Sequence, residues 1–257
     1  MLIDVAVPGG TAEAWVSRPE TADRGDGDHP GVVLFMDAFG IRPQIEQMAD
    51  RIAGWGYVVL APNVFHRQGT VEELAPAVDL RDEHASADYL RQAFSRVRGL
   101  TADLVAPDLV AYVDDLLAVP GVADGPIGVT GYCMGARLAL RTSCLRPDVV
   151  AACGGFHGGG LATEDPDSPH RRLGESRATY VFGHADKDRS MPADAIERLE
   201  HALDQAGREY VSEVYPGARH GYTMADTAAY DEAAAERHYA ALEDLFRRSL
   251  GGRSPSP

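Results

Sequence analysis

One short stretch of the sequence carries a residue that could act as a nucleophile. Cys133 stands between two glycines in Gly131-Tyr132-Cys133-Met134-Gly135. An apolar run, residues 126–130, precedes this stretch, and a helix-forming run, residues 136–141, follows it. A strand, a glycine-flanked nucleophile and a helix form a nucleophile elbow, the sharp turn that exposes one reactive side chain above a sheet. The pattern therefore predicts acyl transfer through the sulfur of Cys133.

A cysteine nucleophile needs a base, a group that orients the base, and donors for the oxyanion. His220 lies in the loop after the last predicted strand, and Asp186 lies in the loop after the strand before it. Cys133, Asp186 and His220 follow the order nucleophile, acid, histidine that α/β-hydrolases use. We predict Asp186 as the orienting acid, with Asp188 as the alternative. His157 and His184 are also candidates for lining the cleft.

Segments of strand and helix character alternate along the chain, which is typical of an α/β fold with a mainly parallel sheet and helices on both faces. Strands are expected at residues 3–7, 12–17, 31–36, 57–61, 126–130, 149–154, 179–182 and 210–215. Helices are expected at about 43–54, 82–98, 106–117, 192–206 and 228–250, with His238 on a helix surface. Residues 1–250 are predicted to form one α/β-hydrolase domain. Residues 21–29 are predicted to be a loop, and 251–257 a disordered tail.

Composition narrows the class of protein. The 257 residues carry a formal net charge of -15, which disfavours nucleic acid and anionic membranes as partners. The first residues do not resemble a signal peptide, and no apolar run reaches the ~18 residues of a membrane span, so we expect a cytoplasmic protein. The three cysteines lack metal-site spacing, and Cys144 and Cys153 are interpreted as small buried residues. No metal or cofactor is expected, and the oligomeric state is not predicted.

Four motifs, spread over nearly the whole chain, resemble the dienelactone hydrolase family, α/β-hydrolases that use cysteine to open small lactones and esters. They are Met36-Asp37-Ala38-Phe39-Gly40, Gly56-Tyr57-Val58-Val59-Leu60-Ala61-Pro62, Gly131-Tyr132-Cys133-Met134-Gly135, and the loops that hold Asp186 and His220. The resemblance implies Cys133 as nucleophile, His220 as base and Asp186 as orienting acid. It also implies an oxyanion hole made by the backbone N–H groups of Ala38 and Met134.

Asp37 occupies a position where the family usually has glutamate. In the family that carboxylate is linked to activation of the cysteine, because it contacts the thiol and accepts its proton as substrate binds. Asp37 keeps the charge but is one methylene shorter, and the resemblance implies a catalytic role for it. The alternative is that Asp37 orders its own loop through hydrogen bonds to backbone N–H groups.

The substrate is less well predicted than the reaction. Family members that act on dienelactone hold its carboxylate with arginines, one of them four residues after the catalytic histidine, where this chain has Met224. Residues 65–101 are expected to form part of the pocket wall. The substitutes considered for the missing arginine are Arg42, Arg67 and Arg81. The residues expected to contact substrate are Phe39, Tyr132, Tyr222 and Met224.

These observations predict a cysteine-dependent hydrolase of small carboxylic esters or lactones, which acts through an acyl-enzyme thioester on a small-molecule substrate. Free cysteine, with a pKa near ~8.5, is only slightly ionised at neutral pH, so the nucleophile must be activated by its neighbours. Two alternatives remain open. The same residues permit acyl transfer to an acceptor other than water, and the fold permits a catalytically silent protein that only binds a ligand.

Overall fold

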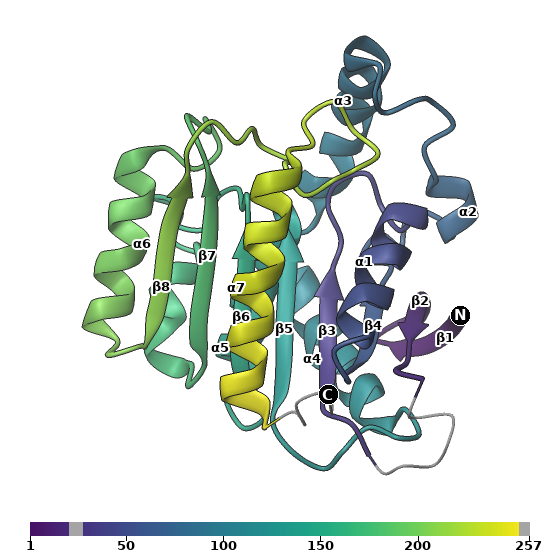
Figure 1. Cartoon of the computed structure of the whole chain (residues 1–257). Helices are drawn as coiled ribbons and strands as arrows, with labels where there is room; N and C mark the ends of the chain where they lie inside the picture. The colour runs from purple at the N-terminus through teal and green to yellow at the C-terminus, as the bar shows by residue number, and fades with distance from the viewer. Residues whose placement is uncertain (21–27, 252–257) are drawn as a thin grey trace.

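The protein is described by a computed structural model that covers residues 1–20 and 28–251. The predicted tail beyond residue 251, and most of the predicted loop at 21–29, lie outside these residues. The described strands form one eight-stranded sheet in the order β1-β2-β4-β3-β5-β6-β7-β8 (Figure 1). Their bounds are β1 Leu2–Val7, β2 Gly10–Ser17, β3 Gly31–Phe35, β4 Val58–Pro62, β5 Ile127–Tyr132, β6 Val150–Phe156, β7 Thr179–Ala185 and β8 Tyr210–Tyr215.

The sheet is antiparallel at one edge and parallel elsewhere. β1 and β2 form the predicted hairpin, and β2 pairs antiparallel with β4. From β4 to β8 every neighbouring pair is parallel. Every residue of β3, β4 and β5 is buried, which explains why these strands are continuous apolar runs. The prediction of an α/β fold with a mainly parallel sheet is confirmed.

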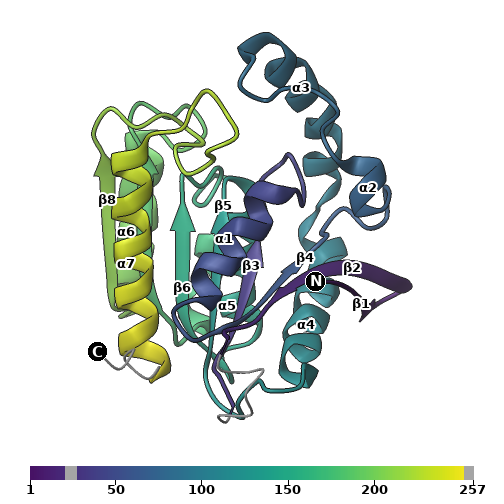
Figure 2. The ribbon, with the colours of Figure 1, turned by 45° about the vertical axis from the view of Figure 1, so that its right-hand side comes forward.

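Helices cover both faces of this sheet. α1 and α7 lie on one face, and α4 and α5 lie on the other (Figures 1 and 2). Their bounds, with the remaining helices, are α1 Pro43–Ala53, α2 Val71–Leu74, α3 Glu83–Gly99, α4 Ala102–Ala118, α5 Met134–Leu145, the 3-10 helix Pro169–Glu175, α6 Ala193–Gln205 and α7 Glu232–Leu250. Most side chains that face the sheet belong to one continuous hydrophobic core, which favours the predicted single domain.

The strand β7 is longer than the sequence predicted. It continues past Phe182 to Ala185, because residues 183–185 stay in register with residues 213–215 of β8. His184 is therefore a buried strand residue whose Nε2 lies 3.1 Å from Ser212 Oγ. It does not line the catalytic cleft.

The long helix α7 also departs from expectation at two points. It begins at Glu232 because Asp231 caps it, accepting the N–H of Ala234. His238, predicted on the surface, is completely buried, with Nδ1 on the Ala235 carbonyl and Nε2 3.2 Å from the Tyr132 hydroxyl. Burial lowers the pKa of His238 to about 3, so it is a neutral core residue.

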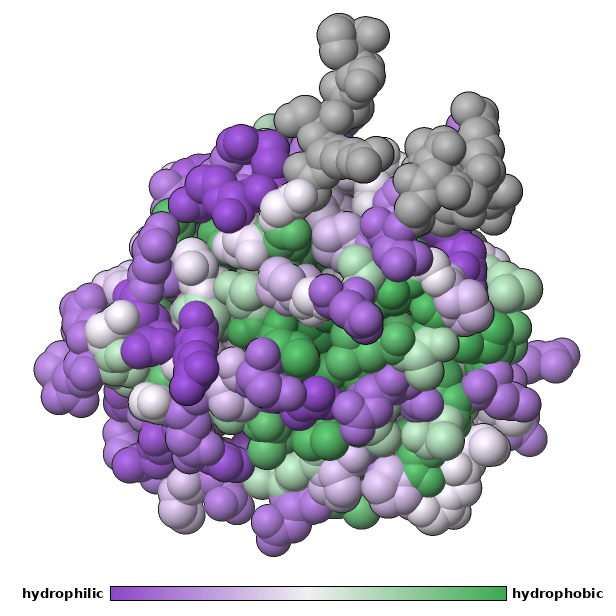
Figure 3. Space-filling view, turned by 90° about the horizontal axis from the view of Figure 1, so that it is seen from below, coloured by the Kyte–Doolittle hydropathy of each residue, from purple (hydrophilic) through white to green (hydrophobic). Residues whose placement is uncertain are grey.

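The two ends of the molecule differ. α3 stands above the carboxyl ends of the strands (Figures 1 and 2). Seen from the opposite end, hydrophilic residues surround a central band of hydrophobic ones (Figure 3).

Within residues 1–20 and 28–251, no helix is long and apolar enough to cross a bilayer. The same residues hold no group of three or more His, Cys, Asp or Glu arranged for a metal ion.

Candidate active site

The predicted elbow connects β5 to α5. Cys133 has φ 56° and ψ -117°, a left-handed conformation that is strained for a residue with a side chain. The neighbouring glycines make this turn sterically feasible. A Cβ on Gly131 would overlap the carbonyl of Gly135, and one on Gly135 would overlap the carbonyl of Phe35. The G-x-C-x-G pattern therefore reflects the close approach of β3, β5 and α5 around the cysteine.

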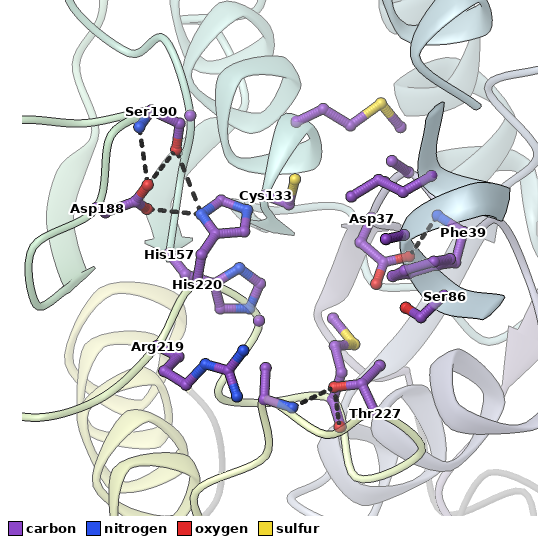
Figure 4. Close-up of a pocket in the computed structure, with 18 of the residues that line it drawn as sticks. Asp37, Phe39, Ser86, Cys133, His157, Asp188, Ser190, Arg219, His220 and Thr227 are labelled. Atoms are coloured by element: carbon purple, nitrogen blue, oxygen red, sulfur yellow. Dashed lines mark hydrogen bonds and ion pairs between the residues drawn. The ribbon is translucent and has the colours of Figure 1, made fainter. Parts of the chain in front are cut away.

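Cys133 opens into a cavity of about 560 Å³ at the carboxyl ends of the strands (Figure 4). Its walls come from the loop after β3, from α3 and the residues before it, from the elbow, and from the loops after β6, β7 and β8. Its lining includes Asp37, Ala38, Phe39, Leu80, Glu83, Ser86, Ala87, Leu90, Phe94, Val97, Cys133, Met134, Arg137, His157, Asp188, Arg189, Ser190, Arg219, His220, Met224, Ala228 and Ala229.

His220 contacts a carboxylate at the rim of this cavity. Its Nδ1 lies 2.6 Å from Asp188 Oδ2, and the Asp188 side chain is only 5% exposed. Asp188 Oδ1 accepts the backbone N–H of Ser190 at 2.8 Å and its hydroxyl at 2.7 Å. These bonds fix the carboxylate, so that it can hold the imidazole in one orientation beside Cys133 (Figure 4).

The predicted contact between Asp186 and His220 is wrong, because Asp188 makes it. Asp186 accepts the Gly217 N–H at 3.0 Å and donates its own N–H to Ala218, so it joins the ends of β7 and β8. The cause is the extra length of β7, which puts Asp186 directly after the strand. Asp188 lies beyond Lys187, whose φ of 54° reverses the chain towards the histidine.

Charges around His220 favour its protonated form. Burial lowers the pKa of His220, but Cys133 and Asp188, through charge and hydrogen bonds, outweigh burial and raise it to about 10. Burial likewise raises the pKa of Asp188, and its bonds to His220 and Ser190 turn the net shift downward. The site therefore stabilises an imidazolium between a carboxylate and the cysteine sulfur.

The other two described cysteines are unsuited to this chemistry. Cys144 and Cys153 are buried and free, as expected. Burial raises the pKa of Cys144 to about 11 and that of Cys153 well above its ordinary value, so both thiols stay protonated. Cys133 alone among the three lines the cavity and lies beside a histidine.

Ala38 and Met134 lie where the resemblance implies the oxyanion hole. Both residues line the cavity that Cys133 opens into. Met134 is the first residue of α5, and the N–H groups of a first helical turn have no partner within the helix. Ala38 precedes Phe39, whose N–H is held by Asp37. Both backbones thus border the cavity beside Cys133, where their N–H groups could reach an oxyanion.

Asp37 lines the cavity, but both oxygens of its carboxylate are engaged elsewhere. Its Oδ1 accepts Arg42 Nη1 at 2.7 Å and the Phe39 N–H at 3.0 Å, and its Oδ2 accepts Arg42 Nη2 at 3.1 Å. Arg42 also binds Asp226, with Nε 2.6 Å from Oδ2. Asp37 and Arg42 form a buried ion pair within the loop after β3, and the contact of Arg42 with Asp226 ties this loop to the loop after β8. These contacts match the loop-ordering alternative.

Two of the four residues expected to contact substrate line the cavity, namely Phe39 and Met224. Tyr132 and Tyr222 are not among the described residues that line it, and both are fully buried. The hydroxyl of Tyr132 lies against His238, and that of Tyr222 donates to the Gly183 carbonyl at 3.0 Å. The prediction is wrong for these tyrosines, because their hydroxyl groups are used inside the core.

The arginines considered as substitutes lie outside the cavity. Arg42 pairs with Asp37, Arg67 pairs with Asp108, and Arg81 donates to a carbonyl. The cavity is instead lined by three arginines that the sequence did not single out: Arg137, Arg189 and Arg219.

His157, a sequence candidate for lining the cleft, lines the cavity. It follows β6 with φ 37°, is 1% exposed, and packs its ring edge-to-face on His220 with centroids 5.2 Å apart. Its Nε2 lies 2.8 Å from Thr223 Oγ1, whereas no described residue bonds its Nδ1. Burial lowers the pKa of His157 well below its ordinary value, so it is a neutral side chain packed against His220.

The strand order and the elbow define the protein as an α/β-hydrolase fold with cysteine at the nucleophile position. Comparisons with known proteins agree. The model of the dienelactone hydrolase family matches residues 13–250, and the chain belongs to that family.

Individual relatives cover most of this chain. It is 28% identical over 237 residues to the carboxymethylenebutenolidase of Rhodococcus opacus, spanning 90% of this chain and 84% of the relative. A Synechocystis protein, provisionally named a carboxymethylenebutenolidase, is 27% identical over 87% of this chain and 88% of its own. A solved structure from Klebsiella pneumoniae, provisionally a dienelactone hydrolase, shares the fold with a TM-score of 0.79 and 24% identity, over 96% of this chain and 98% of that chain.

Proposed function

We propose that this protein is a cysteine-dependent hydrolase of small carboxylic esters or lactones. The observation that supports this most is the 2.6 Å contact between His220 and Asp188 beside Cys133 at the elbow. Family membership supports the reaction class, and the carboxymethylenebutenolidase relatives support lactone opening as one form of it.

In the first step the Cys133 thiolate attacks the carbonyl carbon, and a C–S bond forms as the carbonyl electrons move to oxygen. The backbone N–H groups of Ala38 and Met134 bind this oxyanion. Losing one such donor typically costs about 10²–10³ in rate. His220 protonates the departing alkoxide, which leaves an acyl thioester on Cys133.

In the second step water hydrolyses the thioester. His220, now neutral, removes a proton from the water, and the thiolate leaves as the carboxylic acid forms, which then loses its proton to solvent. Asp188 acts throughout by holding Nδ1 of the imidazole, so that Nε2 faces the reacting atoms. Ser190 supports it by fixing the carboxylate.

In this proposal Asp37 does not accept a proton. Its ion pair with Arg42 and its bond to the Phe39 N–H hold the turn that presents Ala38. A fixed donor costs no reorganisation when the oxyanion forms. Asp37 is thus a positioning residue for the oxyanion hole.

The proposal also bears on where the protein works. The mechanism requires Cys133 as a free thiol, and all three cysteines are free in the described residues. A reducing compartment such as the cytoplasm maintains that state. The substrate is a small molecule, because the reacting atoms lie inside a cavity of about 560 Å³.

Hydrolysis of p-nitrophenyl acetate tests this function. We expect Cys133→Ala and His220→Ala each to lose about 10³-fold or more in kcat/KM, because nucleophile and base act as a unit. Cys144→Ala, which also removes a thiol, is the matched control and should keep near wild-type turnover. Unchanged turnover by Cys133→Ala would falsify the proposal.

A further inference from the structure

One wall of the catalytic cavity is formed by α3. Its lining residues follow helical spacing along a single face of the helix. They are Glu83, Ser86, Ala87, Leu90, Phe94 and Val97. Beyond the first turn this face is mainly apolar. The wall that residues 65–101 were expected to supply is therefore hydrophobic where it meets the cavity.

Of this face, only Val97 at its end packs against the hydrophobic core. Among the residues of α3 only Ala93 is buried, and Phe94 is 45% exposed although it is a large hydrophobic residue. Exposed apolar area of this kind is unfavourable unless something covers it. This face continues into the catalytic cavity, so a molecule bound in the cavity would cover it.

The cavity is also lined by apolar side chains from three other segments of the chain. They are Phe39, Leu80, Met224, Ala228 and Ala229. Met224, four residues after His220, is 1% exposed. Apolar side chains from α3 and from these three segments thus line the cavity beside the Cys133 sulfur.

The arginines around the cavity differ in whether they form an ion pair with a carboxylate. Arg219 is paired with Glu83 at 3.0 Å, and both are largely exposed at the rim. Arg137, one helical turn after Cys133, is half-buried and has no carboxylate partner among the described residues. Burial lowers the pKa of Arg137, which shows that its charge is poorly solvated. Arg189 also lines the cavity and is exposed. Arg137 and Arg189 are the groups through which an anionic substrate would compete with an apolar one.

We infer that the cavity selects uncharged esters that carry an apolar chain or ring of several carbons, with the carbonyl at Cys133 and the apolar part between α3 and Met224. This inference rests on the proposed hydrolase function and names its substrate class. A volume of about 560 Å³ is larger than a simple acetate ester needs and lies within the usual range for drug-sized ligands.

The test compares kcat/KM for two ester pairs, p-nitrophenyl acetate against p-nitrophenyl hexanoate, and methyl acetate against hexyl acetate. Buried methylenes favour binding, so we expect a preference of about tenfold or more for the longer chain in at least one pair. Leu90→Asp and Phe94→Asp should remove that preference. Gln92→Asp, exposed on the same helix and outside the cavity wall, is the matched control and should retain it.

Hydrolysis of a carboxylate-bearing ester, mono-p-nitrophenyl adipate, distinguishes a preference for anionic substrates from a preference for uncharged ones. The inference expects it to be hydrolysed more slowly than the hexanoate. Faster hydrolysis that Arg137→Gln or Arg189→Gln abolishes would overturn the inference in favour of an anionic substrate. Cys133-dependent hydrolysis with no chain-length preference in either pair would also overturn it, yet leave the proposed function intact. Turnover that persists in Cys133→Ala would instead overturn the proposed function.

Discussion

Asp188 Oδ2 lies 2.6 Å from His220 Nδ1, and two bonds from Ser190 fix the same carboxylate. Asp186, two residues earlier, bonds the backbone of Gly217 instead. Of the two carboxylates on this loop, that of Asp188 orients the imidazole and that of Asp186 joins the ends of two strands. Substituting each aspartate in turn tests this assignment, and each variant serves as the control for the other.

Asp188→Asn should lower kcat by about 10²–10⁴-fold, because the amide no longer stabilises the imidazolium or fixes its orientation. Asp186→Asn should keep most of the activity, since an amide oxygen can still accept the Gly217 N–H. The measurement is kcat on p-nitrophenyl acetate, with circular dichroism to show that both variants are folded. A larger loss in Asp186→Asn than in Asp188→Asn would contradict the assignment.

Arg42→Met should lower the free energy of unfolding by about 3–5 kcal/mol, because it leaves the buried Asp37 carboxylate without its cation. Urea unfolding measures the change. The matched control is Arg237→Met, which removes an exposed ion pair to Glu213 and should cost less than about 1 kcal/mol. Equal losses in the two variants would show that the Asp37–Arg42 pair contributes no more than a surface pair.

Gly135→Ala should destabilise the fold by more than about 2 kcal/mol and abolish activity. The added Cβ would overlap the carbonyl oxygens of Phe35 and Met36, so β3 and α5 would have to move apart at the elbow. Gly174→Ala is the control, because a Cβ there meets no atom within 4 Å. Thermal unfolding and esterase assays on both variants report the result. A fully active Gly135→Ala would mean that the elbow tolerates this displacement.

Acid should destabilise the protein through its buried histidines. Burial lowers the pKa of His238 to about 3 and that of His184 to about 4, whereas an unfolded histidine has a pKa near ~6.5. Between these values the unfolded state binds more protons, so stability is lost as pH falls from about 6.5. Each histidine contributes a slope of up to about 1.4 kcal/mol per pH unit.

His238→Gln should therefore flatten the pH dependence of unfolding, even though it lowers stability at neutral pH. Urea titrations at pH 6.5 and 5.0 measure the slope for wild type and variant. The exposed His201→Gln controls for the loss of a histidine. Parallel slopes in wild type and His238→Gln would rule out His238 as a source of acid sensitivity.

Most of the fold could be predicted from the sequence, because buried parallel strands are continuous apolar runs and helices are amphipathic. It placed β8 at Tyr210–Tyr215 as observed, and it located the elbow from two glycines and a cysteine. It failed at the end of β7, since residues 183–185 are not a typical apolar run and extend the strand only by pairing with β8. That error of three residues led to Asp186 in place of Asp188.

Side-chain direction was the other information that the sequence lacked. Tyr132 and Tyr222 sit in motifs that border the site, yet their hydroxyl groups bond inside the core. His238 lies on a helix with many charged residues, but it faces the sheet. The apolar face of α3 was visible as a periodic pattern. Its role depended on a cavity that exists only once distant loops come together.

The central claim is that acyl transfer passes through the Cys133 sulfur. The most direct measurement is rapid acid quench of the enzyme during turnover of p-nitrophenyl acetate, followed by mass mapping of its peptides. We predict an acetyl group on the peptide that contains Cys133, absent from Cys133→Ala and accumulating further in Asp188→Asn, where deacylation is slowed. Hydrolysis by the wild type with Cys133 unmodified and the acetyl group on another residue would contradict the account.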